Sequence, residues 1–349
     1  IGILRAGGHP SALDVESLVT GVLAGEIDLD TFGQWLVALA DCGETTAEIA
    51  GVAAALRSRM VRVPNPFPDL ADTCGTGGDG SGSFNISTAA AIVVAAAGLP
   101  VAKHGNRAVS SRTGSADVLE RLGVRVDGPP SIAVDCIAHI GLAFCLAPTH
   151  HPAMARVGPL RRSLGRPTVF NLVGPLCNPA GAGIQVIGVG RAAVRDAVAE
   201  AAVLGGARRV LVVSSPLGSP ATPAVPPPTL DEVSLFGVTD VIDVGPDGMR
   251  RHTWTAEDFG LTTHPIADLA KLEVSGPEES AAAIRDVLGG EPGPRRDVVV
   301  LNAAATLWAA GRAASLPAAR SLAEQAIDDG AAAAKLAALV ARSNQSHGP

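Results

Sequence analysis

The chain has 349 residues with a formal net charge of −7, 47% hydrophobic residues and only 3% aromatic residues. This length suits two domains, or one large domain with a smaller appendage, and the composition suits a packed α/β protein. The acidic balance and the lack of a dense Lys/Arg run argue against nucleic-acid binding and favour small-molecule chemistry. Five cysteines without a C-x-x-C pair predict neither a disulfide framework nor a zinc site and are typical of a reducing cytoplasm.

The first part of the chain is expected to be helical. Between residues 11 and 60 apolar residues recur at helical spacing, as at Phe32, Leu36 and Leu39, and short Gly- and Asp-containing breaks separate the candidate helices. Prolines interrupt the pattern between residues 64 and 68, because proline cannot continue a helix and restrains the residue before it. We therefore place a domain boundary there, with residues 1–67 forming a small helical domain.

The rest of the chain, residues 68–349, is expected to form a larger α/β domain with a mostly parallel central sheet, because short apolar segments alternate with Ala-rich helical stretches. The strand candidates are residues 101–102, 143–146, 185–189, 210–213 and 298–301. Residues 150–165 look helical and are expected to pack against the N-terminal helices. The proline-rich residues 214–229 are expected to form a loop without regular structure. The most apolar run, residues 89–99, is too short to cross a bilayer, so no membrane association is expected.

The strongest chemical signal is a glycine-rich stretch at residues 72–88, immediately before a helical run. Glycines let backbone N–H groups approach a phosphate, and a helix start adds unpaired N–H donors and a positive dipole end. The G-x-G-x-x-G pattern at residues 75–80 alone suits a dinucleotide-binding fold, but that fold also requires an acidic residue about 20 positions later to bind the ribose. No Asp or Glu occurs between Asp79 and Asp117, and no Gly-Lys-Ser/Thr of a Walker A loop follows the glycines. The stretch predicts an anion site, the alternative being a flexible turn without a ligand.

A second polar segment, K-H-G-N-R at residues 103–107, follows a candidate strand. Lysine can neutralise a phosphate as a point charge, while Asn and Ser can hydrogen-bond phosphate or ribose hydroxyls. Open α/β sheets bind ligands at the carboxyl ends of strands, where this loop is expected. Such a loop alone is usually solvated surface, but its place one helix after the glycine stretch favours a binding role.

Three motifs together resemble the signature of the anthranilate phosphoribosyltransferase family: G-T-G-G-D at residues 75–79, N-I-S-T at residues 85–88 and K-H-G-N-R at residues 103–107. Their order and separation fit the family as well. The resemblance spans most of the chain, including the helical N-terminal unit. It continues through residues 114–120, 147–152, 161–162, 167–172, 174–176, 178–179 and 230–232.

The resemblance implies a fold and a reaction. The family has a small helical domain hinged to a larger α/β domain, and it converts anthranilate and phosphoribosyl pyrophosphate into phosphoribosyl anthranilate and pyrophosphate with magnesium, in tryptophan biosynthesis. The family also implies a homodimer formed through the helical domains. By motif match, the donor would be held by Gly75, Gly78, Asp79, Asn85, Ser87, Thr88, Lys103 and Ser110.

The same match implies a magnesium site. Ser87 would approach the ion, and Asp231 with Glu232 would be the family's acidic pair. Adjacent carboxylates are usually a solvated surface pair, but Mg²⁺ prefers carboxylate oxygens together with substrate phosphates and water. The chain departs from the family's pattern just before the pair, where prolines at residues 226–228 stand in place of a Gly- and Asp-containing turn. The acids are in register by motif, while the path of their loop is left open.

For the aromatic acceptor, the resemblance points to residues along a cleft between the domains. A guanidinium at Arg161 would bind the anthranilate carboxylate through two hydrogen bonds, which would specify a benzoate-like acceptor. A surface arginine and structurally hydrogen-bonded histidines are the alternatives at these positions. The acceptor residues are His104, Asn106, Pro148, His151 and Arg161, with Met154 where some relatives have an aromatic residue.

No covalent nucleophile is expected, because no Ser-His-Asp or Cys-His pattern stands out. An aniline nitrogen is unprotonated at neutral pH, so the enzyme has to position it at the ribose anomeric carbon and stabilise the departing pyrophosphate. We expect catalysis to depend on Lys103, Asn106 and Arg161, with magnesium and Lys103 offsetting the charge on pyrophosphate. Closure of the two domains is expected to exclude water.

Three other functions stay open at this point. A pyrimidine nucleoside phosphorylase resembles this family in fold, but the acidic pair and the N-I-S-T motif favour the transferase. A catalytically silent relative that serves as a binding or regulatory subunit is disfavoured by the intact phosphate motifs. Transfer to a substituted anthranilate in a specialised pathway keeps the chemistry and changes only the acceptor.

Overall fold

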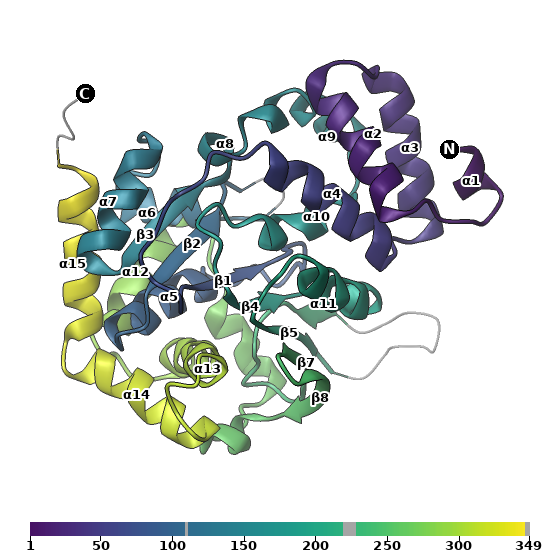
Figure 1. The fold of residues 1–349 in the computed structure, drawn as a ribbon. Helices are drawn as coiled ribbons and strands as arrows, with labels where there is room; N and C mark the ends of the chain where they lie inside the picture. The colour runs from purple at the N-terminus through teal and green to yellow at the C-terminus, as the bar shows by residue number, and fades with distance from the viewer. Residues whose placement is uncertain (109–110, 219–227, 346–349) are drawn as a thin grey trace.

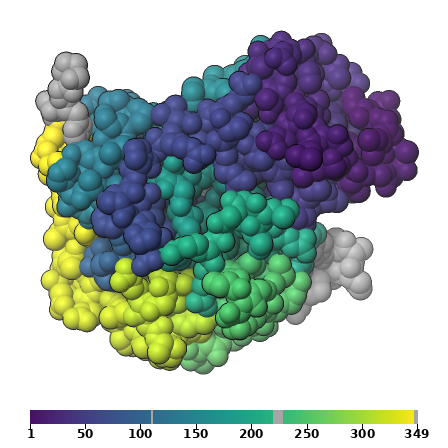
Figure 2. All heavy atoms as spheres, in the orientation of Figure 1, coloured from purple at the N-terminus to yellow at the C-terminus, as the bar shows by residue number. Residues whose placement is uncertain are grey.

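The computed structural model describes residues 1–108, 111–218 and 228–345. It has a small N-terminal helical unit and a larger α/β part built on a mostly parallel sheet, which confirms the predicted fold class. In Figure 1 the N-terminal helices occupy one corner, beside the sheet and its covering helices. Figure 2 shows the same division on the surface, with the purple N-terminal residues gathered at upper right.

In the helical unit, the second and third helices each begin at a residue whose side chain caps the helix start. Ser11 accepts a hydrogen bond from the Asp14 N–H at 3.2 Å, and Asp28 accepts one from the Thr31 N–H at 2.7 Å. These bonds satisfy backbone donors that a helix start leaves unpaired. The helices are α1 (Gly2–Arg5), α2 (Ala12–Ala24), α3 (Leu29–Cys42) and α4 (Thr46–Ser58).

A later segment, residues 147–164, lies beside these helices. The segment packs against α2 and α3. It forms three short helices rather than one, because Pro148, Pro152 and Pro159 each stand within the first two positions of a new helix. The three are α8 (Ala147–His150), η1 (Pro152–Ala155) and α9 (Gly158–Leu164).

The strands of the described residues form an eight-stranded sheet in the order β3-β2-β1-β4-β5-β7-β8, with β6 paired to β5. The pairs among β1 to β5 are parallel, whereas β7 is antiparallel to both β5 and β8. Parallel strands are covered on both faces, so their residues are mostly buried, including the polar residues Asp72 on β1 and Lys103 and His104 on β2. The strands are β1 (Ala71–Gly75), β2 (Val101–Gly105), β3 (Leu142–Leu146), β4 (Ile184–Gly188), β5 (Arg209–Pro216), β6 (Thr229–Leu230), β7 (Thr239–Gly245) and β8 (Gly248–Trp254).

Helices cover both faces of the sheet. Val210 and Val212 of β5 join the buried cluster that contains the N-terminal helices, while Leu211 and Val213 join the cluster on the other face. α11 packs between β5 and α4 on the first face, and α5 packs with α13 on the second. The remaining helices are α5 (Ile86–Ala96), α6 (Ser115–Arg121), α7 (Pro130–Ile140), α10 (Phe170–Val173), η2 (Gly174–Cys177), η3 (Ala192–Val194), α11 (Arg195–Leu204), η4 (Ala256–Phe259), η5 (Ile266–Leu272), α12 (Pro277–Leu288), α13 (Pro294–Ala309), α14 (Leu316–Asp328) and α15 (Ala331–Ser343).

Two local predictions are wrong. Residues 298–301, expected as a strand, lie within α13 and are fully buried. A helix that is apolar on every side shows no period, so a short stretch of it cannot be told from a buried strand. Residues 214–216, expected in a loop, complete β5 and pair partly with β6. Residues 219–227 of the same expected loop lie outside the described residues.

None of the helices in the described part of the chain is long and apolar enough to span a membrane. The five cysteines are free thiols, of which Cys42 is exposed, Cys74 half-buried and the other three buried.

Candidate active site

Two neighbouring strands at the centre of the sheet lead to helices on opposite faces. β1 is followed by α5 on one face, and β4, its parallel neighbour, by α11 on the other. Open α/β sheets bind ligands at such a point, in the crevice outside the carboxyl ends of the strands. The three sequence motifs lie at this edge, at the end of β1, the start of α5 and the end of β2. The fold therefore brings the motifs together.

The loop between β1 and α5 follows a path that requires glycine. Gly77, Gly78, Gly80 and Gly82 have φ of 66°, 79°, 72° and 66°, a region in which a side chain is strained. A Cβ placed on Gly77, Gly78 or Gly80 would meet no described atom within 4 Å. This open glycine backbone, which leads into the start of α5, suits an anion.

Lys103 is a buried cation beside this loop. The residue is only 4% exposed, and its ammonium donates to the Thr73 carbonyl oxygen at 2.5 Å and to Ser87 Oγ at 3.2 Å. Thr73 Oγ1 in turn donates to the Ser87 carbonyl oxygen at 2.8 Å. Lys103, on β2, thus links β1 to the first turn of α5. The oxygens that its ammonium contacts directly are neutral. Such a charge attracts an anionic ligand.

Three carboxyl groups adjoin the same loop. Asp231 accepts a hydrogen bond from the Gly77 N–H at 3.0 Å, and Glu232 accepts one from the Ser87 N–H at 3.1 Å. Burial raises the pKa of both carboxyls, and the neighbouring acids, Asp79 among them, raise it further. Oδ2 of Asp79 is buried and has no hydrogen bond within the described residues. The acidic pair therefore reaches the glycine loop despite the prolines that precede it.

These oxygens suit magnesium. Within the described residues, no three His, Cys, Asp or Glu side chains are grouped as a complete metal site. Mg²⁺, however, is usually bound by one or two carboxylates together with substrate phosphates and water. A divalent cation would stabilise the ionised forms of Asp231 and Glu232, whose pKa the protein raises, and would give the unpaired oxygen of Asp79 a partner. The residues present therefore fit a magnesium ion that is bound together with a phosphate-bearing ligand.

The other residues predicted to bind the phosphoribosyl donor differ in whether their polar side-chain atoms already have partners. Asn85 precedes α5, and its side chain is already bonded to two other side chains. Thr88 Oγ1 is buried and has no partner within the described residues. Asn106 is exposed at the end of β2, and its Oδ1 accepts a hydrogen bond from the next N–H at 2.8 Å. Ser110 lies outside the described residues.

Two of the predicted acceptor residues, His104 and His151, lie side by side with ring centroids 5.1 Å apart. His104 Nδ1 lies 3.2 Å from the Gly174 carbonyl oxygen, and His151 Nε2 lies 3.0 Å from that of Cys177. Carbonyl oxygens only accept, so these nitrogens carry the proton. Burial lowers the pKa of both rings, that of His104 to about 3. The second nitrogen of each ring is buried without a partner in the described residues, so each neutral ring presents an unpaired acceptor.

Arg161, also predicted for the acceptor, is half-buried on α9. Its guanidinium carbon lies 5.3 Å from the centroid of the Phe170 ring, and within the described residues this ring is its recorded partner. Burial lowers the pKa of the guanidinium, although arginine stays charged in proteins. Pro148 and Met154 lie on the neighbouring helices α8 and η1. The helical unit thus carries a half-buried cation that no carboxylate of the described residues neutralises.

Asp72, the first residue of the glycine-rich stretch, lies in the site although no role was predicted for it. It is fully buried on β1, where Oδ1 accepts a hydrogen bond from the His104 N–H at 3.3 Å and Oδ2 accepts one from Asn178 Nδ2 at 2.8 Å. Burial raises the pKa of this carboxyl to about 6. The sequence contains little signal for it, because β1 reads Ala-Asp-Thr-Cys-Gly, and only the fold shows that this acid is buried, which is rare for Asp unless it is paired. Asp72 fixes the end of β2 on which Lys103 and His104 stand.

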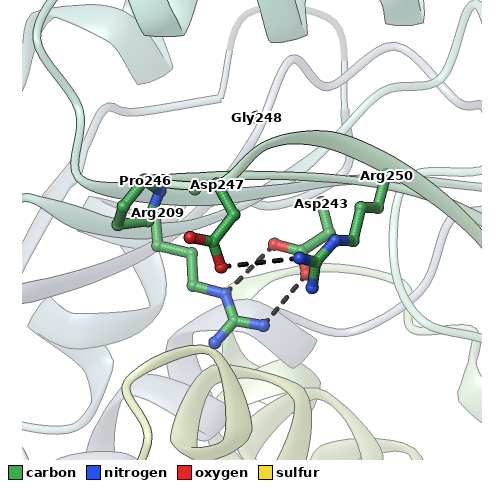
Figure 3. Close-up of a pocket in the computed structure, with 7 residues that line it drawn as sticks. Arg209, Asp243, Pro246, Asp247, Gly248 and Arg250 are labelled. Atoms are coloured by element: carbon green, nitrogen blue, oxygen red, sulfur yellow. Dashed lines mark hydrogen bonds and ion pairs between the residues drawn. The ribbon is translucent and has the colours of Figure 1, made fainter.

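A cavity of about 130 Å³ lies elsewhere, at the turn between β7 and β8 (Figure 3). Asp243 and Arg209 point toward one another there, joined by two hydrogen bonds of 3.1 and 2.9 Å. Because Val210 pairs with Val244, this turn lies at the start of β5, at the opposite edge from the motifs. The charges of Arg209 and Asp243 satisfy each other, so we do not assign the site to this cavity.

Comparisons with known proteins agree with this geometry. Residues 67–333 match the "Glycosyl transferase family, a/b domain", and residues 1–60 match the "Glycosyl transferase family, helical bundle domain". Over 338 residues the chain is 46% identical to an anthranilate phosphoribosyltransferase from Moorella thermoacetica, covering 96% of this chain and 95% of that protein.

Solved structures of the same enzyme are similar over the whole fold. The crystal structure of anthranilate phosphoribosyltransferase from Thermus thermophilus is 40% identical, with a TM-score of 0.87 over 98% of both chains. The enzyme from Saccharomyces cerevisiae in complex with PRPP and Mg is 28% identical, with a TM-score of 0.82 over 95% of this chain and 93% of that chain. In complex with 4-fluoroanthranilate it is 27% identical over the same shares, with a TM-score of 0.80.

Proposed function

We propose that this chain, which belongs to the anthranilate phosphoribosyltransferase family, transfers the phosphoribosyl group of phosphoribosyl pyrophosphate to the amine of anthranilate. The products are N-(5-phosphoribosyl)anthranilate and pyrophosphate. The observation that carries the proposal is the buried ammonium of Lys103, which contacts Ser87 at the start of α5, the same residue whose N–H binds the Glu232 carboxyl. Asp231 binds the adjoining glycine loop. A cation, open backbone N–H groups and carboxyls in one crevice suit a polyphosphate bound with a divalent cation.

We assign the donor to the glycine loop and the first turn of α5. Lys103 supplies the positive charge for a phosphate group, while the loop backbone supplies N–H donors. The unpaired hydroxyl of buried Thr88 is a further donor at this place. The proposed donor residues are Gly75, Gly78, Asp79, Asn85, Ser87, Thr88, Lys103, Asn106 and Ser110.

We assign magnesium to Asp231, Glu232 and the Ser87 hydroxyl. These residues would hold a magnesium ion together with the donor, and the ion would supply positive charge to offset the charge on the departing pyrophosphate. The protein's own contribution is a set of carboxyls held in place by the N–H groups of Gly77 and Ser87. Lys103 adds a second positive charge on the side of α5.

We assign the acceptor to the space between the α/β part and α9. Arg161 binds the carboxylate of anthranilate, because its charge has no ion-pair partner within the described residues. The neutral rings of His104 and His151 offer acceptor nitrogens to which an aromatic amine can donate. Asn106 directly follows β2, the strand that carries Lys103 and His104.

The chemistry then needs no covalent intermediate with the protein. The lone pair of the amine nitrogen forms a bond to the anomeric carbon while the bond from that carbon to pyrophosphate oxygen breaks. The nitrogen becomes acidic as it bonds to carbon, and its proton passes to the departing pyrophosphate. Holding both reactants in line removes most of the entropic barrier, and the buried charges stabilise the leaving group.

The proposal includes two larger-scale features. Residues 1–67, with residues 150–165, would act as one domain that closes on residues 68–349 and excludes water from the donor. A homodimer would form through the helical domains, on which Ile3 and Leu13 are 55% and 75% exposed. Sedimentation equilibrium of the wild type and of Leu13→Asp tests the dimer, since a charge in an apolar interface should shift the mass toward a monomer.

The proposed reaction is tested by the loss of anthranilate fluorescence in the presence of phosphoribosyl pyrophosphate and magnesium. We expect loss only when all three are present, and the double variant Asp231→Ala/Glu232→Ala should abolish the magnesium-dependent part of turnover. A comparison of substituted anthranilates identifies the preferred acceptor. Phosphate-dependent cleavage of a pyrimidine nucleoside, or calorimetry without saturable donor binding, would overturn the proposal in favour of a phosphorylase or a silent relative.

A further inference from the structure

Ser280, far from the motifs in sequence, contacts the glycine loop directly. It lies in the first turns of α12 and is fully buried. Its hydroxyl donates to Oδ1 of Asn85 at 2.8 Å and accepts a hydrogen bond from the Asn85 backbone N–H at 3.1 Å. One hydroxyl therefore holds both the main chain and the side chain of the residue at which α5 begins.

Thr113 completes the set of contacts around this amide. Thr113 Oγ1 donates to Oδ1 of Asn85 at 3.0 Å, and Nδ2 of Asn85 donates to the Thr113 carbonyl oxygen at 3.4 Å. A carbonyl oxygen can only accept, so the NH₂ group must face it and the amide oxygen must face the two hydroxyls. The orientation of the Asn85 amide is therefore fixed by Thr113 and Ser280 together.

In this orientation one N–H of the Asn85 carboxamide has no hydrogen-bond partner within the described residues. An NH₂ group has two N–H donors, and within the described residues the recorded bond of Nδ2 is the one to Thr113. Both lone pairs of Oδ1 are occupied by hydroxyl donors. The half-buried side chain of Asn85 therefore keeps an unpaired N–H donor and no free acceptor within the described residues, which suits an oxyanion and not a cation.

We propose that Ser280 is a positioning residue for the donor: it orients the Asn85 carboxamide so that its free N–H hydrogen-bonds a phosphate oxygen of phosphoribosyl pyrophosphate. The inference rests on the proposed function, because it names the ligand of that same site. It makes α12, a C-terminal helix outside all the sequence motifs, part of the support of the donor site. Its effect should appear in donor affinity rather than in use of the acceptor.

The first test replaces Ser280 and measures donor binding and turnover separately. Ser280→Ala removes both bonds to Asn85, and the loss of an oriented donor of this kind corresponds to about a tenfold rise in the KM for phosphoribosyl pyrophosphate. The kcat and the KM for anthranilate should change less than twofold. Ser343→Ala is the matched control, because Ser343 is equally buried and its hydroxyl bonds the Arg125 N–H and the Val340 carbonyl instead.

The second test asks whether Ser280 acts through Asn85. If it does, adding Ser280→Ala to Asn85→Ala should raise the donor KM no further, whereas independent effects would multiply. Ser280→Cys keeps the volume with a weaker hydrogen-bonding group and covers the case in which the alanine variant does not fold. We expect its donor KM to lie between those of the wild type and the alanine variant.

The outcomes separate this inference from the proposed function. Failure of the wild type to consume anthranilate with the donor would overturn the proposed function, while calorimetric binding of phosphoribosyl pyrophosphate to the wild type and Ser280 variants still tests the positioning role. A donor affinity unchanged in both Ser280 variants, or multiplicative effects in the double variant, would overturn the positioning role alone.

Discussion

A methyl group on Gly188 would lie 1.6 Å from the carbonyl oxygen of Asp231. Gly188 ends β4 and pairs with Gly75 at the end of β1, where a methyl group would lie 2.5 Å from Asp231 Oδ2. Two glycines on neighbouring strands thus form the slot into which the acidic loop fits. Neither is required by a positive φ; both are required by the close approach of Asp231.

We expect Gly188→Ala to displace Asp231 and to lower kcat/KM by at least about a hundredfold, because backbone atoms at this distance cannot give way without moving the loop. The magnesium concentration at half-maximal activity should rise as well. Steady-state kinetics across a magnesium titration measures both. Gly245→Ala in β7 is the control, since its nearest neighbour, Arg209 Cγ, would lie at an ordinary 3.7 Å. Wild-type kinetics for Gly188→Ala would show that the slot does not determine the site.

Lys103→Ala and Asp79→Ala should each weaken use of phosphoribosyl pyrophosphate. Loss of a buried, charge-assisted contact corresponds to about a 10- to 100-fold rise in the donor KM. The KM for anthranilate should stay within about twofold of the wild-type value, since both residues belong to the donor side. Lys335→Ala controls for the loss of a lysine, because Lys335 is half-buried and donates to the Ile140 carbonyl oxygen at 2.7 Å. An unchanged donor KM in both site variants would contradict the assignment.

Contiguous motifs made the donor side of the site predictable from the sequence. The glycine loop, the helix start after Asn85 and the Lys103 segment are each encoded within a few residues, and the strand-end rule places them at one edge. Supporting contacts between distant segments leave no such pattern. Ser280 is 195 residues from Asn85, and Asn178 is 106 residues from Asp72.

The same difference between local and distant information explains the errors in the fold. Residues 298–301 form a local apolar run that suits a strand as well as a helix. They are helical because α13 packs against α5, a contact that the local sequence does not reveal. β8 is an edge strand with mostly exposed side chains, so it lacks the apolar run of a buried strand. Charged residues such as Arg250 and Arg251 interrupt any apolar run, so the sequence pattern did not predict this strand.

Burial of His104 should make the protein less stable in acid. The folded protein lowers the pKa of this ring from 6.5 to about 3, so the neutral form is favoured and the unfolded chain binds the proton more readily. This contribution to stability is complete above pH 6.5 and is lost as the pH falls toward 3. The stability lost by pH 5 is about 2 kcal/mol. Buried Asp72, whose pKa is raised to about 6, acts in the opposite direction as the pH rises.

His104→Asn retains a donor for the Gly174 carbonyl oxygen and removes the titration. We therefore expect urea unfolding to show a loss of stability between pH 7 and pH 5 that is smaller by about 2 kcal/mol in this variant than in the wild type. His139→Asn, which changes an exposed histidine, should behave as the wild type does. Equal losses in all three proteins would mean that His104 is protonated in the folded state at pH 5.

The last prediction concerns the choice of acceptor and depends on Arg161. A half-buried guanidinium that lies over Phe170 without an ion-pair partner in the described residues is held ready for a carboxylate. Removing such a charge-assisted contact corresponds to about 1.5 to 3 kcal/mol, so Arg161→Ala should lower kcat/KM for anthranilate by roughly tenfold to a hundredfold or more. Donor affinity, measured by calorimetry, should hardly change.

The acceptor series distinguishes carboxylate recognition from a structural role. Arg161→Lys should recover only part of the loss, because an ammonium keeps the charge but lacks the planar fork that matches a carboxylate. Aniline lacks the carboxylate, so its slow reaction should be nearly the same in the wild type and in both variants. Arg162→Ala, which alters the exposed neighbour on the same helix, should leave both acceptors unaffected. If Arg161→Ala instead depresses the reactions of anthranilate and aniline equally, the residue serves the packing or closure of the helical unit, and the carboxylate must be bound near His104 and His151.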